Sequence, residues 1–349
     1  MATGSDSTRS KRPTSVGLPS AQGGAVPAKR AGAGASRAGR TKALALLAAL
    51  LVVMPFLFPN SYFFEVAVLV LMNAVVCLGL NLLIGYAGQI SLGHAAFFAL
   101  GGYGSAILAA NYGWPTWLSL PVTVAAIGVL AAIVGKPTLR FKGHYLAMAT
   151  LGLGVIVNLV LTNEDRLTGG PDGMGVPPLV IAGFTFAGEK LWYGIAAVVL
   201  WASVWLATNL IDSPVGRALR AVHGSEVAGE TVGIVIERWK LAVFVISAVL
   251  AALSGALMAH YSGFITPSKS GFLHSVELVI MVVFGGMASI WGAIVGAAIL
   301  TLLPQLLTVF KDYETMVFGG VLIATMIFFP RGIVPTLARL WTRRSGSES

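Results

Sequence analysis

Charged residues and cysteine are scarce in this chain of 349 residues. Only 11% of its residues are charged, against roughly 25% in globular proteins, whereas 56% are apolar and the mean hydropathy is +0.83. This composition excludes an ordinary soluble core, so the chain is predicted to be one integral membrane domain. The single cysteine, Cys77, excludes an intrachain disulfide and a multi-cysteine metal site, and we expect it to be a packing residue.

Motifs for catalysis are absent as well. The five histidines show no metal-ligand spacing with cysteines or carboxylates, and no Gly-x-Ser-x-Gly elbow surrounds the run that ends at His94. Residues 34–41 resemble a phosphate-binding loop, but they carry Arg40 where Lys is needed, and no strand precedes them. We therefore expect no catalytic residue, no metal site and no cofactor in this chain.

The two ends of the chain differ from its middle. Residues 1–42 are rich in Ser, Gly, Ala, Pro and basic residues, and Asp6 is their only acid, which predicts a disordered basic tail. Residues 43–332 form the predicted membrane domain, and residues 333–349 form a second basic tail. We expect anionic membrane lipid, and no nucleic acid, to attract the first tail; a specific partner is the alternative.

The middle of the chain is a series of apolar segments, which predicts an all-α, polytopic bundle of roughly eight to ten membrane helices. The segments are 43–58, 62–84, 90–110, 116–135, 145–162, 191–210, 241–261, 275–287, 290–309 and 315–330. Several are shorter than the roughly 20 residues that cross a bilayer. We therefore predict irregular backbone that lines a cavity at residues 86–91 and 284–289.

The basic residues predict the orientation of the bundle. If the chain starts inside the cell, 19 of its 23 Lys and Arg fall in the connections and tails on the cytoplasmic side, as the positive-inside rule requires. Both termini and residues 211–240 are then cytoplasmic, in a bacterial inner membrane, and residues 163–190 face the other way.

One charged, amphipathic stretch, residues 213–234, interrupts the apolar segments. Ser213 before Pro214 is a typical helix start. Gly224 and Gly233 are predicted to end two short helices. Two short helices at the membrane surface predict a docking surface for a soluble motor subunit.

A second informative stretch, residues 79–103, places polar residues among small and apolar ones. One interpretation is a substrate pathway; the other is hydrogen bonding between helices that pack through small residues. The candidates for the pathway are Asn73, Asn81, Gln89, Ser91 and His94.

Glu277 is the only carboxylate well inside a predicted apolar segment, and acids in membranes are usually functional. It is a further pathway candidate; a position near the membrane surface, paired with a helix N-terminus, is the alternative. For Gly292 and Gly296, helix packing is favoured over function.

Between Gly79 and Gly332 the chain resembles the permease subunits of branched-chain amino acid ABC importers, of the Liv-type M class. The resemblance rests on several motifs together, each weak alone. They are LNLLIGYAGQISLGHAAF at 80–97, GHYLA at 143–147, TGGP at 168–171, GRALR at 216–220, EVAGE at 226–230, and PRG at 330–332. The basic tail of 42 residues is longer than the family pattern requires.

The resemblance implies a coupling region that sits in a cleft of an ATPase subunit. The residues carried over to it are Gly216, Arg217, Arg220, Glu226, Glu230 and Gly233. It also implies three kinds of partner: a sister permease, two cytoplasmic ATPase subunits and an extracytoplasmic substrate-binding protein. ATP and Mg²⁺ are cofactors of the ATPase subunits.

The function expected from these observations is ATP-driven import of a hydrophobic amino acid by alternating access. The chain itself would form part of the path and catalyse nothing. The alternatives are the same machine with urea, a short amide or another small solute as cargo, and a self-sufficient secondary transporter, which broken helices alone would permit.

Overall fold

The computed structural model describes residues 37–141, 143–181, 183–224 and 235–307, together with 319–320, 323 and 332–336. Most of these residues are helical, which confirms the predicted all-α membrane bundle. The elements that sequence analysis did not predict include four strands of two residues each. They pair as two antiparallel ribbons: β1 (Met174–Gly175) with β4 (Phe264–Ile265), and β2 (Val180–Ile181) with β3 (Phe184–Thr185).

Nine apolar helices in the described residues correspond to nine of the ten predicted segments. They are α1 (Arg37–Leu57), α2 (Ser61–Asn81), α3 (His94–Ala110), α4 (Thr116–Thr138), α5 (His144–Asn163), α7 (Glu189–Asp212), α10 (Ile236–Ser262), α11 (Phe272–Gly285) and α12 (Ile290–Leu307). Six are long and apolar enough to cross a membrane, whereas α3, α11 and α12 are shorter. Helix α1 begins six residues before the predicted boundary at 43, and the tenth segment, 315–330, lies mostly outside the described residues.

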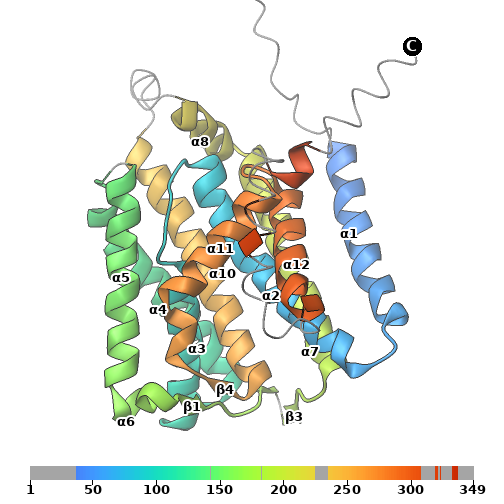
Figure 1. Cartoon of the computed structure of the whole chain (residues 1–349), viewed down its shortest axis with the longest axis vertical. Helices are drawn as coiled ribbons and strands as arrows, with labels where there is room; N and C mark the ends of the chain where they lie inside the picture. Colours follow the sequence, from blue (N-terminus) through green and yellow to red (C-terminus); the bar gives the residue numbers. More distant parts are fainter. Residues whose placement is uncertain are drawn as a thin grey trace, which may run out of the picture.

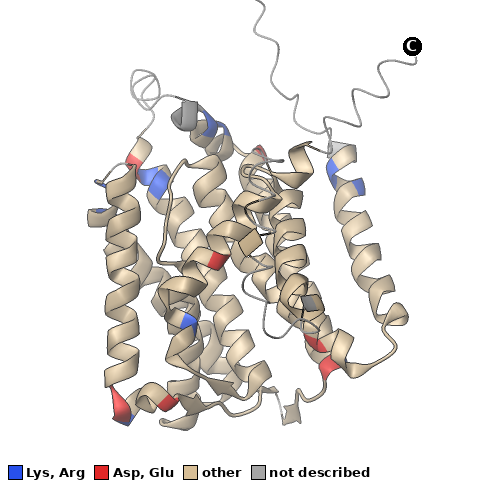
Figure 2. Cartoon of the chain, in the orientation of Figure 1, with Lys and Arg blue, Asp and Glu red and all other residues tan. Residues whose placement is uncertain are grey.

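The short elements gather at the two ends of the bundle (Figure 1). Helix α8 (Pro214–Gly224) lies at one end with the first turn of α1, and we call this the α8 end. Helix α6 (Asp165–Thr168) and the ribbons lie at the opposite end, the α6 end. Most of the described Lys and Arg are at the α8 end (Figure 2). The predicted grouping of the 136–144 and 211–240 connections, opposite residues 163–190, is therefore present in the fold.

The centre of the bundle is built around α2, most of which is buried, whereas α1 is largely exposed. Helix α2 contacts α7, α10, α11 and α12. Cys77 of α2 is fully buried, and its Sγ lies 3.7 Å from Sδ of Met281 in α11. The cysteine is thus a packing residue, as predicted.

Irregular backbone interrupts the helices at both predicted places. Helix α2 continues as the π-helix η1 (Leu82–Tyr86), and residues 87–93 are then irregular before α3 begins. Residues 286–289 form the turn between α11 and α12. A third break lies between the predicted segments 241–261 and 275–287: residues 263–271, which include the 3₁₀ turn η3 (Pro267–Ser270), separate α10 from α11. A membrane tolerates such backbone only where protein or a polar cavity surrounds it.

The turn between α11 and α12 is tight because small residues face one another. A Cβ atom on Gly296 would lie 2.1 Å from the carbonyl oxygen of Met281, and one on Gly292 would lie 2.7 Å from that of Gly285. Only glycine permits this approach, and close backbone contact is how small residues hold helices together in membranes. The packing interpretation of Gly292 and Gly296 is thus confirmed.

Candidate functional site: a docking helix and a charged cavity

Helix α8 starts as the sequence predicts. The hydroxyl of Ser213 accepts hydrogen bonds from the backbone N–H groups of Val215 (3.1 Å) and Gly216 (3.4 Å) and donates one to the carbonyl of Leu210 (2.6 Å). The side chain therefore caps the new helix and also bonds to the end of α7. The two helices meet at a defined corner.

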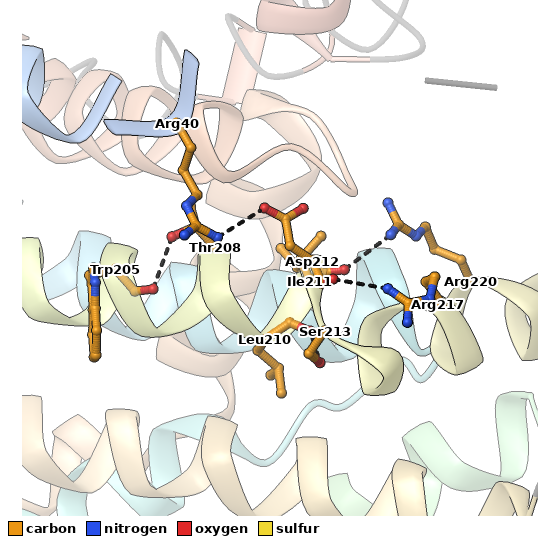
Figure 3. A network of polar contacts seen from close by, with 9 residues as sticks. All are labelled: Arg40, Trp205, Thr208, Leu210, Ile211, Asp212, Ser213, Arg217 and Arg220. Carbon is orange, nitrogen blue, oxygen red and sulfur yellow. Dashed lines mark hydrogen bonds and ion pairs between the residues drawn. The ribbon is translucent and has the colours of Figure 1, made fainter. Parts of the chain in front are cut away.

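Two arginines of α8 reach back to α7 (Figure 3). Arg217 donates to the carbonyl of Asp212 at 3.2 Å, and Arg220 donates to the carbonyl of Ile211 at 3.0 Å. The last carbonyls of a helix have no partner within the helix, and their partial negative charge favours a cation. These two predicted coupling residues thus brace α8 against the helix that precedes it.

Close packing makes the same corner stiff. A Cβ atom on Gly216 would lie 2.1 Å from the carbonyl oxygen of Ile211, so a larger residue cannot fit without displacing α8. Leu219 is 2% exposed and anchors the inner face of α8, which contacts α7, α10 and η1. A push on α8 would therefore reach three elements of the bundle.

Helix α1 is tied to this corner from the side. Arg40 forms an ion pair with Asp212 at 3.3 Å (Figure 3). The remaining predicted coupling residues, Glu226, Glu230 and Gly233, lie outside the described residues, and so does the second of the two predicted short helices.

A cavity of about 460 Å³ opens beside α11 and holds two of the predicted pathway residues, Asn73 and Glu277. Asn73 donates to the hydroxyl of Thr301 at 3.0 Å. One carboxylate oxygen of Glu277 accepts a hydrogen bond from Nδ1 of His274 at 3.3 Å, and the Glu277 side chain is 51% exposed. The lining residues are Leu69, Met72, Asn73, Phe98, Met258, Lys269, His274, Glu277, Met281, Leu300, Thr301, Pro304 and Gln305.

Lys269 is the residue of this cavity that sequence reasoning missed. It lies on η3, in the irregular connection between α10 and α11. A signal was available, because Lys269 is one of only four basic residues that the predicted orientation leaves off the cytoplasmic side. A cation that departs from the positive-inside trend is a reason to look for a function.

A second cavity, of about 610 Å³, lies between the first cavity and the α6 end. Leu69 and Met258 line both cavities, so the two are neighbours. Segments of the α6 end, represented by Val176, Phe186 and Glu189, line the second cavity. Together the cavities extend from the α6 end towards α11, which lies between the two ends of the bundle (Figure 1).

The other four pathway candidates line neither cavity. His94 is 1% exposed, with Nδ1 2.9 Å from Oγ of Ser91 and Nε2 2.6 Å from Oγ of Ser247 in α10. Both ring nitrogens are therefore satisfied by the protein. This hydrogen bond between α3 and α10 has the geometry that the packing interpretation describes.

Asn81 is also buried and holds the turn between α11 and α12. Its side-chain oxygen accepts from the N–H of Ala288, and its amide donates to the carbonyl of Ser289, both at 2.9 Å. Ala288 has a φ of 59°, which is unfavourable for alanine, so the amide stabilises a strained turn. Gln89 is 3% exposed, and its Oε1 has no partner among the described residues. The pathway role of these residues stays a prediction.

Comparison with known proteins identifies the family. The family model for "Branched-chain amino acid transport system / permease component" matches residues 62–328. The chain is 32% identical over 316 residues to the high-affinity branched-chain amino acid transport system permease protein LivM of Escherichia coli (strain K12), which covers 84% of this chain and 74% of that protein.

More distant relatives carry the same kind of description. The permease protein LivH of Escherichia coli (strain K12) is 26% identical over 284 residues, covering 75% of this chain and 90% of that protein. BraD of Pseudomonas aeruginosa is 26% identical over 281 residues, covering 75% of this chain and 91% of that protein. No solved structure matches the chain. On the extent of these matches, this multi-pass membrane protein belongs to the family of branched-chain amino acid transport system permease components.

Proposed function

We propose that this chain is the membrane-spanning permease subunit of an ATP-driven importer of branched-chain amino acids. The observation that carries the proposal is the family match over residues 62–328, which spans the helices from α2 to α12, the docking corner where α7 meets α8, and both cavities. The chain provides part of the path. ATP and Mg²⁺ bind to separate ATPase subunits, and no chemistry occurs on this chain.

The assembly that fits this proposal has a sister permease, two cytoplasmic ATPase subunits and an extracytoplasmic binding protein. The protein lies in a bacterial inner membrane. Its α8 end faces the cytoplasm, because most of the described Lys and Arg are at that end (Figure 2). A cysteine in place of Asp172, with Cys77 replaced, should react with an impermeant thiol reagent in intact cells. Protection of that cysteine would reverse the orientation.

The docking corner supports alternating access as the mechanism. The capped start of α8 and the two arginine bonds fix α8 to the end of α7, and α8 also contacts α10 and η1. Closure of the ATPase dimer would move α8 as a unit with these elements. The bundle would then rock between a state open to the binding protein and one open to the cytoplasm.

A steric variant tests this coupling. Gly216→Val places side-chain atoms against the backbone of Ile211, and overpacking of this kind costs about 1–3 kcal/mol. In proteoliposomes that hold the complete complex, we expect leucine uptake and binding-protein-stimulated ATP hydrolysis to fall about tenfold, since 1.4 kcal/mol corresponds to a factor of ten.

The control is Gly194→Val, because a Cβ at Gly194 of α7 meets nothing within 4 Å. Normal uptake and hydrolysis in Gly216→Val would contradict the role of the corner. The wild-type complex tests the rest of the proposal: uptake of urea but not leucine would change the cargo, and uptake without ATP would indicate a secondary transporter.

A further inference from the structure

We propose that the cavity beside α11 binds the zwitterionic head group of an amino acid, with Glu277 binding the α-ammonium group and Lys269 binding the α-carboxylate. The inference rests on the proposed function and names the site at which this chain would contact its cargo. Four observations support it: an exposed carboxylate that bonds only to His274 among the described residues beside an exposed lysine that forms no ion pair with any of them, a helix start, an apolar wall and a route from the α6 end.

The two charges face the same cavity and are not used by the fold. Among the described residues only His274 bonds to Glu277, and it contacts one of the two carboxylate oxygens. No described residue forms an ion pair with Lys269. A charge within a membrane bundle is costly unless it has a partner or water. One exposed charge of each sign in one cavity is complementary to a zwitterion and not to an anion or a cation alone.

The start of α11 suggests how the ligand is oriented. The cap residue Gly271 has no side chain, so no side chain of the cap satisfies the first N–H groups of this 14-residue helix. Lys269 and His274 lie on either side of this start, and both line the cavity. The positive end of the helix dipole adds to the charge of Lys269 and favours a carboxylate there. Glu277, more than one turn into the helix, is then left for the ammonium group.

The remaining wall fits an aliphatic side chain. Apolar side chains from five helices line the same cavity, including Leu69, Phe98, Met258, Met281 and Leu300. Methionine is flexible enough to pack against side chains of different shape. The volume of about 460 Å³ lies within the roughly 300–1,000 Å³ of small-molecule sites.

The second cavity provides access from the α6 end. It shares Leu69 and Met258 with the first cavity and carries the carboxylates of Glu65 and Glu189. These charges would attract the ammonium group of an arriving amino acid. The proposed head-group site is therefore reached from the end of the bundle that the orientation assigns to the binding protein.

Photo-crosslinking in the complete complex tests the site. The probe is photo-leucine, the diazirine analogue of leucine, applied to the complex in lipid nanodiscs without the binding protein, and peptides are mapped by mass spectrometry. We expect adducts on wall residues such as Met72 and Met281. Excess leucine should remove them. The analogues 4-methylpentanoate, which lacks the ammonium group, and 3-methylbutylamine, which lacks the carboxylate, should compete at least about tenfold less well.

Matched variants test whether the negative charge of Glu277 is needed for binding. Glu277→Gln should lower the yield of adducts about tenfold, and Glu277→Asp should restore part of it. Glu164→Gln is the control, because it makes the same chemical change at an exposed residue that lines neither cavity. Equal labelling of Glu277→Gln and wild type, adducts only outside the cavity, equal competition by the one-charge analogues, or failure of Glu277→Gln to assemble with the sister permease would each overturn the proposal.

The two proposals can fail separately. If the wild-type complex imports leucine but the cavity is not labelled, the head-group site is wrong and the importer function stands. If the wild-type complex does not import leucine under ATP, the function itself is wrong.

Discussion

Two polar clusters lie in this bundle, and they differ in what satisfies them. In the closed cluster, His94 and Asn81 are buried and bond to Ser91, Ser247 and the turn at Ala288. In the open cluster, formed by Lys269, His274 and Glu277 at the cavity, the carboxylate is half exposed and the lysine has no ion-pair partner among the described residues. The closed cluster has almost no hydrogen-bonding capacity left for a cargo, whereas the open one does.

The difference shows that a polar residue in a membrane sequence is ambiguous until its partners are known. Hydrogen bonds between membrane helices contribute roughly 0.6 kcal/mol on average and up to about 1.7 kcal/mol. The closed cluster should therefore affect the folding free energy more than transport. The open cluster should affect transport more than folding.

The largest effect on stability is expected for Asn81→Leu. It removes two hydrogen bonds to the turn between α11 and α12 and leaves the N–H of Ala288 and the carbonyl of Ser289 without the partner they have now. Together with the strained φ of Ala288, we expect a loss of about 2 kcal/mol in unfolding free energy. Unfolding by SDS in mixed micelles, followed by circular dichroism, measures it.

Transport by the Asn81→Leu complex should fall only in proportion to the amount of folded complex. If its stability were normal and uptake per folded complex fell tenfold, Asn81 would belong to the pathway and the comparison between the clusters would fail. The matched change in α2 is Asn73→Leu at the cavity. Compared with Asn81→Leu, it should lower the stability less and transport more.

How much the sequence predicted depends on how local each signal is. Long apolar runs specify membrane helices by themselves, and the Ser213–Pro214 pair is a local helix start, so both were predicted. The partners that tie Asn81 and His94 to other helices are not local: Ala288 and Ser247 are 207 and 153 residues away in the chain, although Ser91, the other partner of His94, is near. No periodicity contains such a pairing, so the sequence left both interpretations open.

Lys269 was missed for a related reason. The connection from α10 to α11 reads as a short loop outside the membrane, because serine, proline and glycine surround the lysine. The fold instead places that connection on the wall of a cavity with Glu277. Helices α2, α3 and α12 pack around α11 and supply most of the rest of that wall.

An intermediate effect is expected for Ser247→Ala. The hydroxyl of Ser247 lies 2.6 Å from Nε2 of His94, and both residues are buried, so the substitution leaves a buried ring nitrogen without a partner. We expect a loss of about 1 kcal/mol in unfolding free energy. A double-mutant cycle with His94→Ala isolates the coupling between the two side chains. Additive free energies in that cycle would show that the bond contributes nothing.

The smallest effect on stability, and the sharpest contrast, is expected for Thr301→Val, which keeps the shape of the side chain and removes its hydroxyl. That hydroxyl accepts a hydrogen bond from Asn73 at the cavity wall. Water in the cavity can accept the hydrogen bond of the Asn73 amide in place of the hydroxyl, so the unfolding free energy should change by less than about 0.5 kcal/mol. Leucine uptake should still slow by about threefold or more, roughly 0.6 kcal/mol, because the Asn73 amide, which lines the same cavity as Glu277, loses its fixed orientation. Unchanged uptake kinetics in proteoliposomes, with unchanged stability, would place Asn73 and Thr301 outside the path and leave Lys269 and Glu277 as the polar groups that could contact cargo.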